Sequence, residues 1–66
     1  MNMFQIEYDR LMKLTKAGII AEGIQRGFWA DRPETTAYLL KSRDWNKKSL
    51  ARCVADRITR MELRGY

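Results

Sequence analysis

The sequence predicts an all-α protein that folds as a single domain, residues 1–66, of three or four short helices. Apolar residues recur at steps of three and four along most of the chain, which is the spacing of helices that bury one face. A hydrophobic content of 45%, with seven aromatic residues, is too high for a disordered segment. The only proline, Pro33, stands where a helix can begin.

The first predicted helix covers residues 3–16. Its apolar face consists of Phe4, Tyr8, Leu11 and Met12. A second helical pattern runs through Ile20, Ile24 and Phe28. We expect a break at residues 16–18, where Gly18 follows the first pattern; the alternative is one long helix that uses its glycines for close packing.

The third predicted helix covers residues 32–41. Asp31 can cap it, proline is tolerated in its first turn, and Glu34 stands in the capping-box position. Its apolar positions suggest burial between two neighbours: Ala37, Leu40 and either Tyr38 or Leu39. A turn over residues 42–46 follows, with Asp44 or Asn46 as the next cap.

The last predicted helix covers residues 47–63 and has the most regular pattern. Four apolar residues fall within an arc of about 80° at 100° per residue: Leu50, Val54, Ile58 and Met61. Arg57, Arg60 and Arg64 form a stripe on one flank, and Gly65 can end the helix. With the third helix, it suggests a helix-turn-helix in the C-terminal half, and residues 54–66 are similar to the recognition-helix end of winged helix-turn-helix regulators. However, the connecting turn is longer than usual, and the chain stops where a wing would begin.

The composition argues against several functional classes. The chain has no histidine and one cysteine, so we expect no Ser-His or Cys-His nucleophile, no His-ligated metal and no intramolecular disulfide. We therefore expect that the protein is not an enzyme and has no cofactor. The single cysteine indicates a reducing compartment, and we expect the cytoplasm of a bacterium, with the chain encoded by the bacterium or by a phage. No apolar run is long enough for a membrane span, and the first residues do not resemble a signal peptide. The small size favours a homo-oligomer.

The net charge of +5 comes from one region. Residues 41–66 hold eight basic and three acidic residues, whereas residues 1–40 hold five of each. A local basic excess attracts nucleic acid or an acidic partner, although a solvated basic face is an equally ordinary explanation. The candidate binding cations are Arg43, Lys47, Lys48, Arg52, Arg57, Arg60 and Arg64.

Other residues have both a structural and a functional interpretation. The strip Phe4, Tyr8, Leu11 and Met12 is either core or a protein interface, which in a small dimer can be the same surface. Trp29 and Trp45 can stack on bases or anchor an interface, but core packing is the favoured interpretation. For Cys53, a buried structural thiol is favoured over a reactive one.

Trp29, Trp45, Cys53 and Arg57 resemble the framework of the small AraC negative regulators of enteric bacteria. That family has two tryptophans about fifteen residues apart, a cysteine eight places beyond the second and then a basic residue. The resemblance covers residues 8–57, with departures at Ser42, Ser49 and the pair at residues 25–26. It implies a protein that binds an AraC-type transcription activator and blocks its dimerisation or DNA binding.

We therefore expect a small non-enzymatic regulator of transcription that contacts a DNA-binding activator. The alternatives are direct binding of duplex DNA by the basic last helix, as a repressor, and inhibition of a host protein by a phage-encoded chain.

Overall fold

Four helices make up the fold. The computed structural model describes residues 2–63, except for the side chain of Leu63. The helices are α1 (Met3–Met12), α2 (Lys16–Gln25), α3 (Pro33–Lys41) and α4 (Lys47–Leu63). The described residues contain no strand, so the all-α prediction is confirmed. Two predicted features, the cation Arg64 and the helix end at Gly65, lie outside this range.

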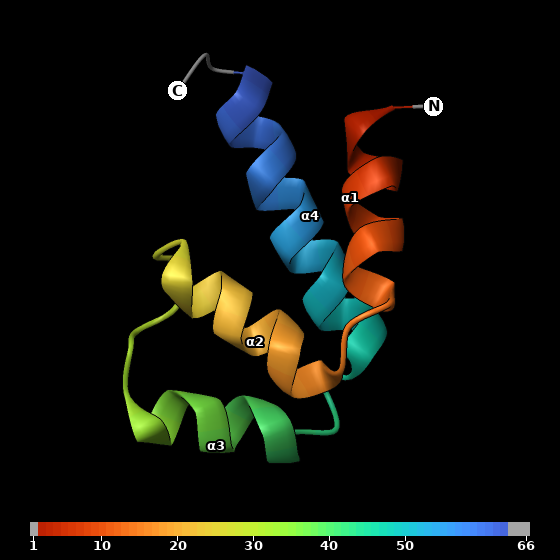
Figure 1. Cartoon of the computed structure of the whole chain (residues 1–66). Helices are drawn as coiled ribbons and strands as arrows, with labels where there is room; N and C mark the ends of the chain where they lie inside the picture. The colour runs from red at the N-terminus through yellow and green to blue at the C-terminus, as the bar shows by residue number, and fades with distance from the viewer. Residues whose placement is uncertain (1, 64–66) are drawn as a thin grey trace.

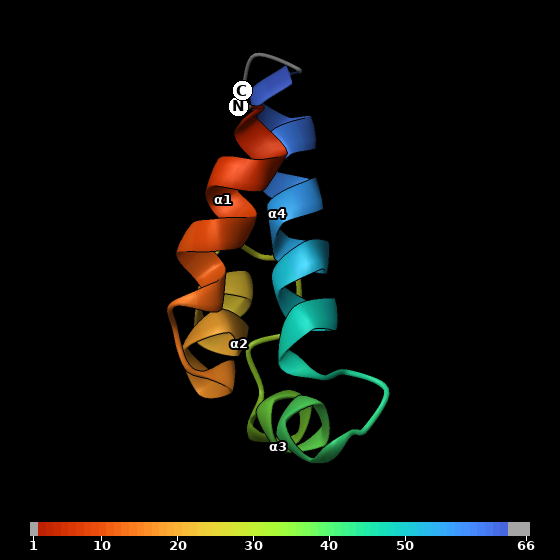
Figure 2. The same ribbon diagram turned by 90° about the vertical axis from the view of Figure 1, so that its right-hand side faces the viewer.

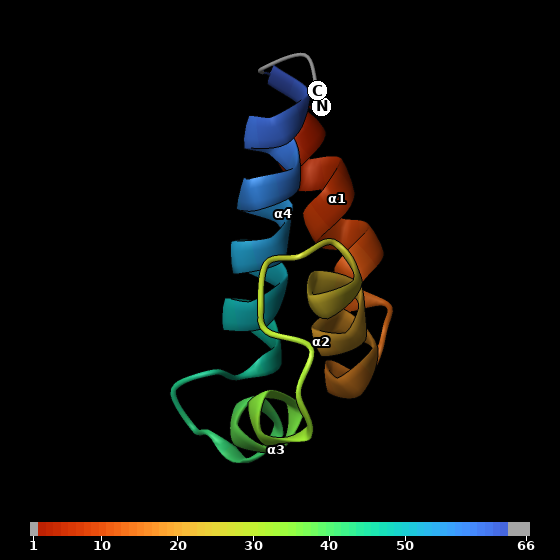
Figure 3. The same ribbon diagram turned by 90° about the vertical axis from the view of Figure 1, so that its left-hand side faces the viewer.

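The helices are arranged around α4. Helices α1 and α4 lie side by side and run in opposite directions (Figure 1, Figure 2). Helix α2 crosses this pair and packs against α4, and α3 packs against α2 near the end where α4 begins (Figure 3). The longest helix therefore contacts both α1 and α2.

Side-chain caps fix the starts of three helices. Asn2 accepts a hydrogen bond from the Gln5 N–H (2.8 Å) at the start of α1. Thr15 does the same for the Gly18 N–H (3.1 Å) at the start of α2. Because Thr15 is the N-cap of α2, residues 13–15 separate the first two helices. The predicted break at residues 16–18 lies slightly too far along the chain, and Gly18 is inside α2.

The start of α4 is capped by Asn46, whose side chain accepts from the Ser49 N–H at 2.8 Å. This settles the choice between Asp44 and Asn46. Helix α3 differs from expectation, because its N-cap is Arg32, without a side-chain hydrogen bond, and the predicted cap Asp31 is wrong. The reason is local: a proline in the first helical position makes the residue directly before it the cap.

The core is formed mainly by α4 with residues from the other helices. The buried apolar residues are Leu11, Ile19, Ile20, Leu39, Leu50, Ala51, Val54, Ala55 and Ile58. Three of the four predicted α4 core residues are buried, but Met61 is 40% exposed. In α3 only Leu39 is buried, so the predicted burial of Leu40 and Ala37 is wrong.

The end of α2 is a glycine-terminated turn that returns the chain toward the helix. Gly27 has φ +85°, a conformation that side chains disfavour. The Phe28 N–H donates to the Gly23 carbonyl (2.8 Å), and the Gly27 N–H donates to the Ile24 carbonyl (3.0 Å). The next residue, Trp29, lies so close to Gly23 that a Cβ at Gly23 would come within 2.5 Å of its Cε3. Only glycine leaves room for this ring.

Arg10 ties α1 to α2 through an ion-pair network. Its guanidinium donates to both carboxylate oxygens of Glu22 (2.9 and 2.6 Å) and to Glu7 (2.7 Å). Arg26 adds a contact to Glu22 at 3.1 Å. The hydrogen bonds from Arg10 lower the pKa of Glu22 below its ordinary value of 4.5, although partial burial opposes the shift. The resulting stabilisation is therefore complete above that ordinary value, and it is lost as the pH falls from there through the lowered pKa of the folded state.

Helices α3 and α4 do not form the closely packed pair of a helix-turn-helix. Helix α3 packs mainly against α2. The Lys16 ammonium of α2 donates to the carbonyls of Leu40 (2.8 Å) and Ser42 (3.2 Å), at the end of α3. Residues 42–46 then form a separate linker. The helix-turn-helix expected for the C-terminal half is thus not formed as a packed unit.

Candidate functional site

A hollow of about 460 Å³ lies beside α4. We call it the α4 hollow; the residues that line it are Phe4, Trp45, Ser49, Arg52, Cys53 and Asp56. Its α4 residues recur at steps of three and four, so they share one helix face. The antiparallel docking of α1 brings Phe4 to this face, and the linker before α4 contributes Trp45. The hollow therefore combines two aromatic rings with a cation and a carboxylate.

The predicted binding cations fall into two groups. Near the start of α4, Arg43, Lys48 and Arg52 are exposed and Lys47 is half-buried. Among the described residues, no recorded ion pair involves any of these four. These cations remain accessible to an anionic group of a partner.

The cations nearer the end of α4 contact the protein itself. Arg57 donates to the Phe28 carbonyl (3.4 Å), and its guanidinium lies 5.5 Å from the centre of the Phe28 ring. Arg60 pairs with Asp56 at 3.1 Å, and the two side chains are 70% and 47% exposed. Arg57 and Arg60 therefore do not form one free basic stripe.

The apolar strip of α1 packs mostly against the core. Leu11 is fully buried, so it cannot contribute to a free surface of this monomer. Phe4, Tyr8 and Met12 are half-buried against the core, and the rings of Phe4 and Tyr8 stack with centroids 6.1 Å apart. Of the four residues, Phe4 lines the α4 hollow.

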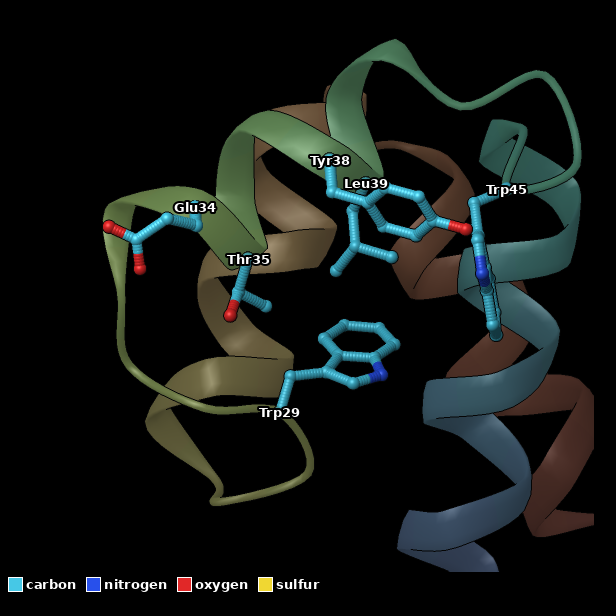
Figure 4. A pocket seen from close by; sticks show the side chains of 6 residues that line it. All are labelled: Trp29, Glu34, Thr35, Tyr38, Leu39 and Trp45. Atoms are coloured by element: carbon cyan, nitrogen blue, oxygen red, sulfur yellow. The ribbon is translucent and has the colours of Figure 1, made fainter.

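A second hollow of about 420 Å³ also has Trp45 in its lining (Figure 4). We call it the tryptophan hollow; the residues that line it are Trp29, Glu34, Thr35, Tyr38, Leu39 and Trp45. Trp29 and Trp45 are half-buried, pack against the core and meet edge to face with centroids 6.1 Å apart. Tyr38 is 62% exposed.

Apart from Arg52, the polar residues that line the two hollows are not marked as site residues by the sequence. Ser49 and Asp56 in the α4 hollow and Thr35 in the tryptophan hollow belong to no motif, and Glu34 was expected only as a capping-box residue. The sequence carries one weak signal, since each pair lies on a helix that follows a turn with a tryptophan, Trp45 before α4 and Trp29 before α3. Only the tertiary arrangement brings them together.

Residues 2–63 contain no cluster of three or more cysteine or acidic side chains that could hold a metal ion. Within the same range, no helix has the length and apolar character needed to cross a bilayer. Cys53 is a half-buried free thiol in the α4 hollow.

The chain matches no family model, no curated protein and no solved structure. What the structure defines is a four-helix all-α domain with two aromatic-lined hollows that share Trp45. The resemblance to the AraC negative regulators thus rests on the sequence residues given above.

Proposed function

We propose that this chain is a non-catalytic regulator that acts by binding another protein through the α4 hollow. The observation that carries the proposal is the mixture of side chains in that hollow, where Phe4 and Trp45 lie beside Arg52 and Asp56. Protein interfaces typically combine aromatic and arginine anchors with a polar rim. A surface for the DNA backbone would instead be lined mainly by cations and donors.

An AraC-type transcription activator is the partner we propose. The resemblance of Trp29, Trp45, Cys53 and Arg57 to the small AraC negative regulators supports this choice. Two of these residues, Trp45 and Cys53, line the α4 hollow, so the resemblance and the candidate surface overlap. Binding there would block dimerisation or DNA binding of the activator.

Co-purification with an AraC-type activator, after nuclease treatment, tests the proposal. Arg52→Glu reverses the charge in the α4 hollow at an exposed position, so it should abolish capture without unfolding the protein. The matched control is Lys13→Glu, the same charge change at an exposed residue that does not line the hollow. Circular dichroism checks that both variants fold. Equal capture by the two variants, or capture that disappears with nuclease, would contradict the proposal.

Direct binding of duplex DNA is the second candidate. It is supported by Arg43, Lys48 and Arg52, which lie near the start of α4 and, within residues 2–63, enter no recorded ion pair. Three phosphate contacts would make log K fall with log salt at a slope of about −2.7. A gel shift of promoter fragments at low salt tests this, and the Lys48→Ala variant should reduce that slope by about 1. Absence of any shift at low salt rules this candidate out.

A further inference from the structure

The tryptophan hollow has the shape of an aromatic corner with one acidic end. Tyr38 and Leu39 lie on one side of the space, Trp29 lies on the other, and Trp45 closes one end (Figure 4). Glu34 and Thr35 come from the opposite end of the same stretch of α3. The indole planes of Trp29 and Trp45 are 77° apart. The faces of such rings are electron-rich and their edges are electron-poor, so a cation is attracted to the faces.

The fold holds Trp29 in place. Gly23 leaves room for its ring, and the turn at Gly27 directs the chain back over α2. Tyr38, in contrast, is 62% exposed and contributes little to the core. Its ring extends along the hollow toward Trp45 (Figure 4), so it adds a second aromatic surface that a ligand in the hollow can reach.

The negative charge of the tryptophan hollow favours a cationic ligand. Glu34 is the only charged residue among those that line it, in a chain whose net charge is +5. Glu34 is exposed, lies one turn before Tyr38 on α3 and enters none of the ion pairs recorded for the described residues. Aromatic faces with a nearby carboxylate attract a cation and repel an anion.

We propose that the tryptophan hollow binds the side chain of an arginine from a partner protein. A guanidinium is planar and weakly hydrated, so it can stack on an aromatic face while one of its N–H groups donates to the Thr35 hydroxyl. The exposed Glu34 side chain points away from the rings (Figure 4), so its carboxylate attracts the guanidinium at longer range. The protein already uses this chemistry internally, where Arg57 lies over the Phe28 ring at 5.5 Å. The inference does not depend on the function proposed for the α4 hollow, although Trp45 belongs to both hollows.

Nuclear magnetic resonance of the full chain with N-acetyl-arginine amide tests the proposal. The protein has two tryptophans, so its two indole N–H resonances report directly on the hollow, and a Trp45→Phe variant assigns them. Both resonances should shift with a saturable dependence on the arginine derivative. The uncharged N-acetyl-citrulline amide, which has nearly the same shape, should produce no such shift.

Variants at the rim distinguish specific binding from nonspecific contact. Glu34→Gln and Tyr38→Ala should each weaken binding by about two- to fivefold, the size of an exposed cation–π or ionic contact. Both positions are exposed, so the fold should survive, as circular dichroism can verify. Glu62→Gln removes an exposed carboxylate from the far end of α4 and should leave the affinity unchanged.

Three results would overturn the proposal. One is the absence of any indole shift, and another is an equal shift with the citrulline derivative. The third is binding that Glu34→Gln and Glu62→Gln weaken to the same extent, because nonspecific attraction to negative charge would then explain it.

Discussion

Replacement of Gly23 by alanine should destabilise the protein, even though alanine favours helices. The new Cβ would lie within 2.5 Å of Cε3 of Trp29, whereas ordinary contacts begin at 3.4 Å. The indole is rigid, so the whole ring must withdraw by about 1 Å, which is the size of adjustment that costs an overpacked core roughly 1–3 kcal/mol. The displacement also disturbs the edge-to-face contact with Trp45, which is worth about 0.5–1.5 kcal/mol.

The expected net loss for Gly23→Ala is about 2 kcal/mol. The better helix propensity of alanine stabilises the folded state by about 1 kcal/mol, which offsets part of the steric cost. In a domain of this size, 2 kcal/mol corresponds to a fall in Tm of roughly 8–16 °C. Urea unfolding followed by circular dichroism measures the free energy, and tryptophan fluorescence reports on the displaced ring.

Gly18→Ala is the matched control, because it makes the same change in the same helix. Its Cβ would meet Leu14 and Thr15 at 3.4 Å, an ordinary contact, so this variant should be unchanged or more stable by up to about 1 kcal/mol. Both variants restrict the unfolded chain equally, so their difference isolates the steric effect. If Gly23→Ala is as stable as Gly18→Ala, Trp29 does not pack on α2 and the reasoning fails.

Three further substitutions test the other contacts that hold the helices. Glu22→Gln should lower the unfolding free energy by about 1 kcal/mol at neutral pH, and the gap from the unmodified protein should close in urea titrations below pH 4.5. Asn46→Ala should lower it by about 1 kcal/mol through loss of the α4 cap, whereas Asp44→Ala should change it by less than about 0.5 kcal/mol in the same assay. Gly27→Ala should lower the melting temperature, since alanine is strained at φ +85°; an unchanged value would contradict the turn geometry.

Helix α4 is the element that the sequence predicts best. Its bounds, Lys47–Leu63, coincide with the predicted range, and Leu50, Val54 and Ile58 are buried as expected. The regular period explains this success, because one face stays apolar over several turns. Met61 is exposed because α2 does not extend to the last turns of α4 (Figure 1).

The boundary between the first two helices was not predicted correctly from the position of Gly18. Gly18 suggested a stop, but a glycine is tolerated in the first turn of a helix, and Thr15 supplied the stronger start signal. The alternative use of glycines for close packing applies to Gly23, whose contact with Trp29 depends on the turn that follows. No local pattern specifies which ring will cover a glycine.

The candidate site could be predicted only in part. Arg52 was among the predicted cations, and Phe4 among the predicted interface residues. Their neighbours Ser49 and Asp56 have no motif, and they join the site because α1 docks beside α4. Arg57 shows the reverse case, since a cation that looks free in sequence lies over Phe28 in the structure.

The packing of α1 against α4 has a consequence for synthesis of the chain. Helix α1 is made before α4, and it buries Leu11 in a core that α4 largely supplies. At the usual rate of translation, roughly seconds pass between the synthesis of α1 and that of α4, and the apolar face of α1 stays uncovered during this time. The domain therefore cannot complete its core on the ribosome until α4 has emerged, and a nascent chain stalled in the linker before α4 should be bound by chaperones and cut readily by proteases.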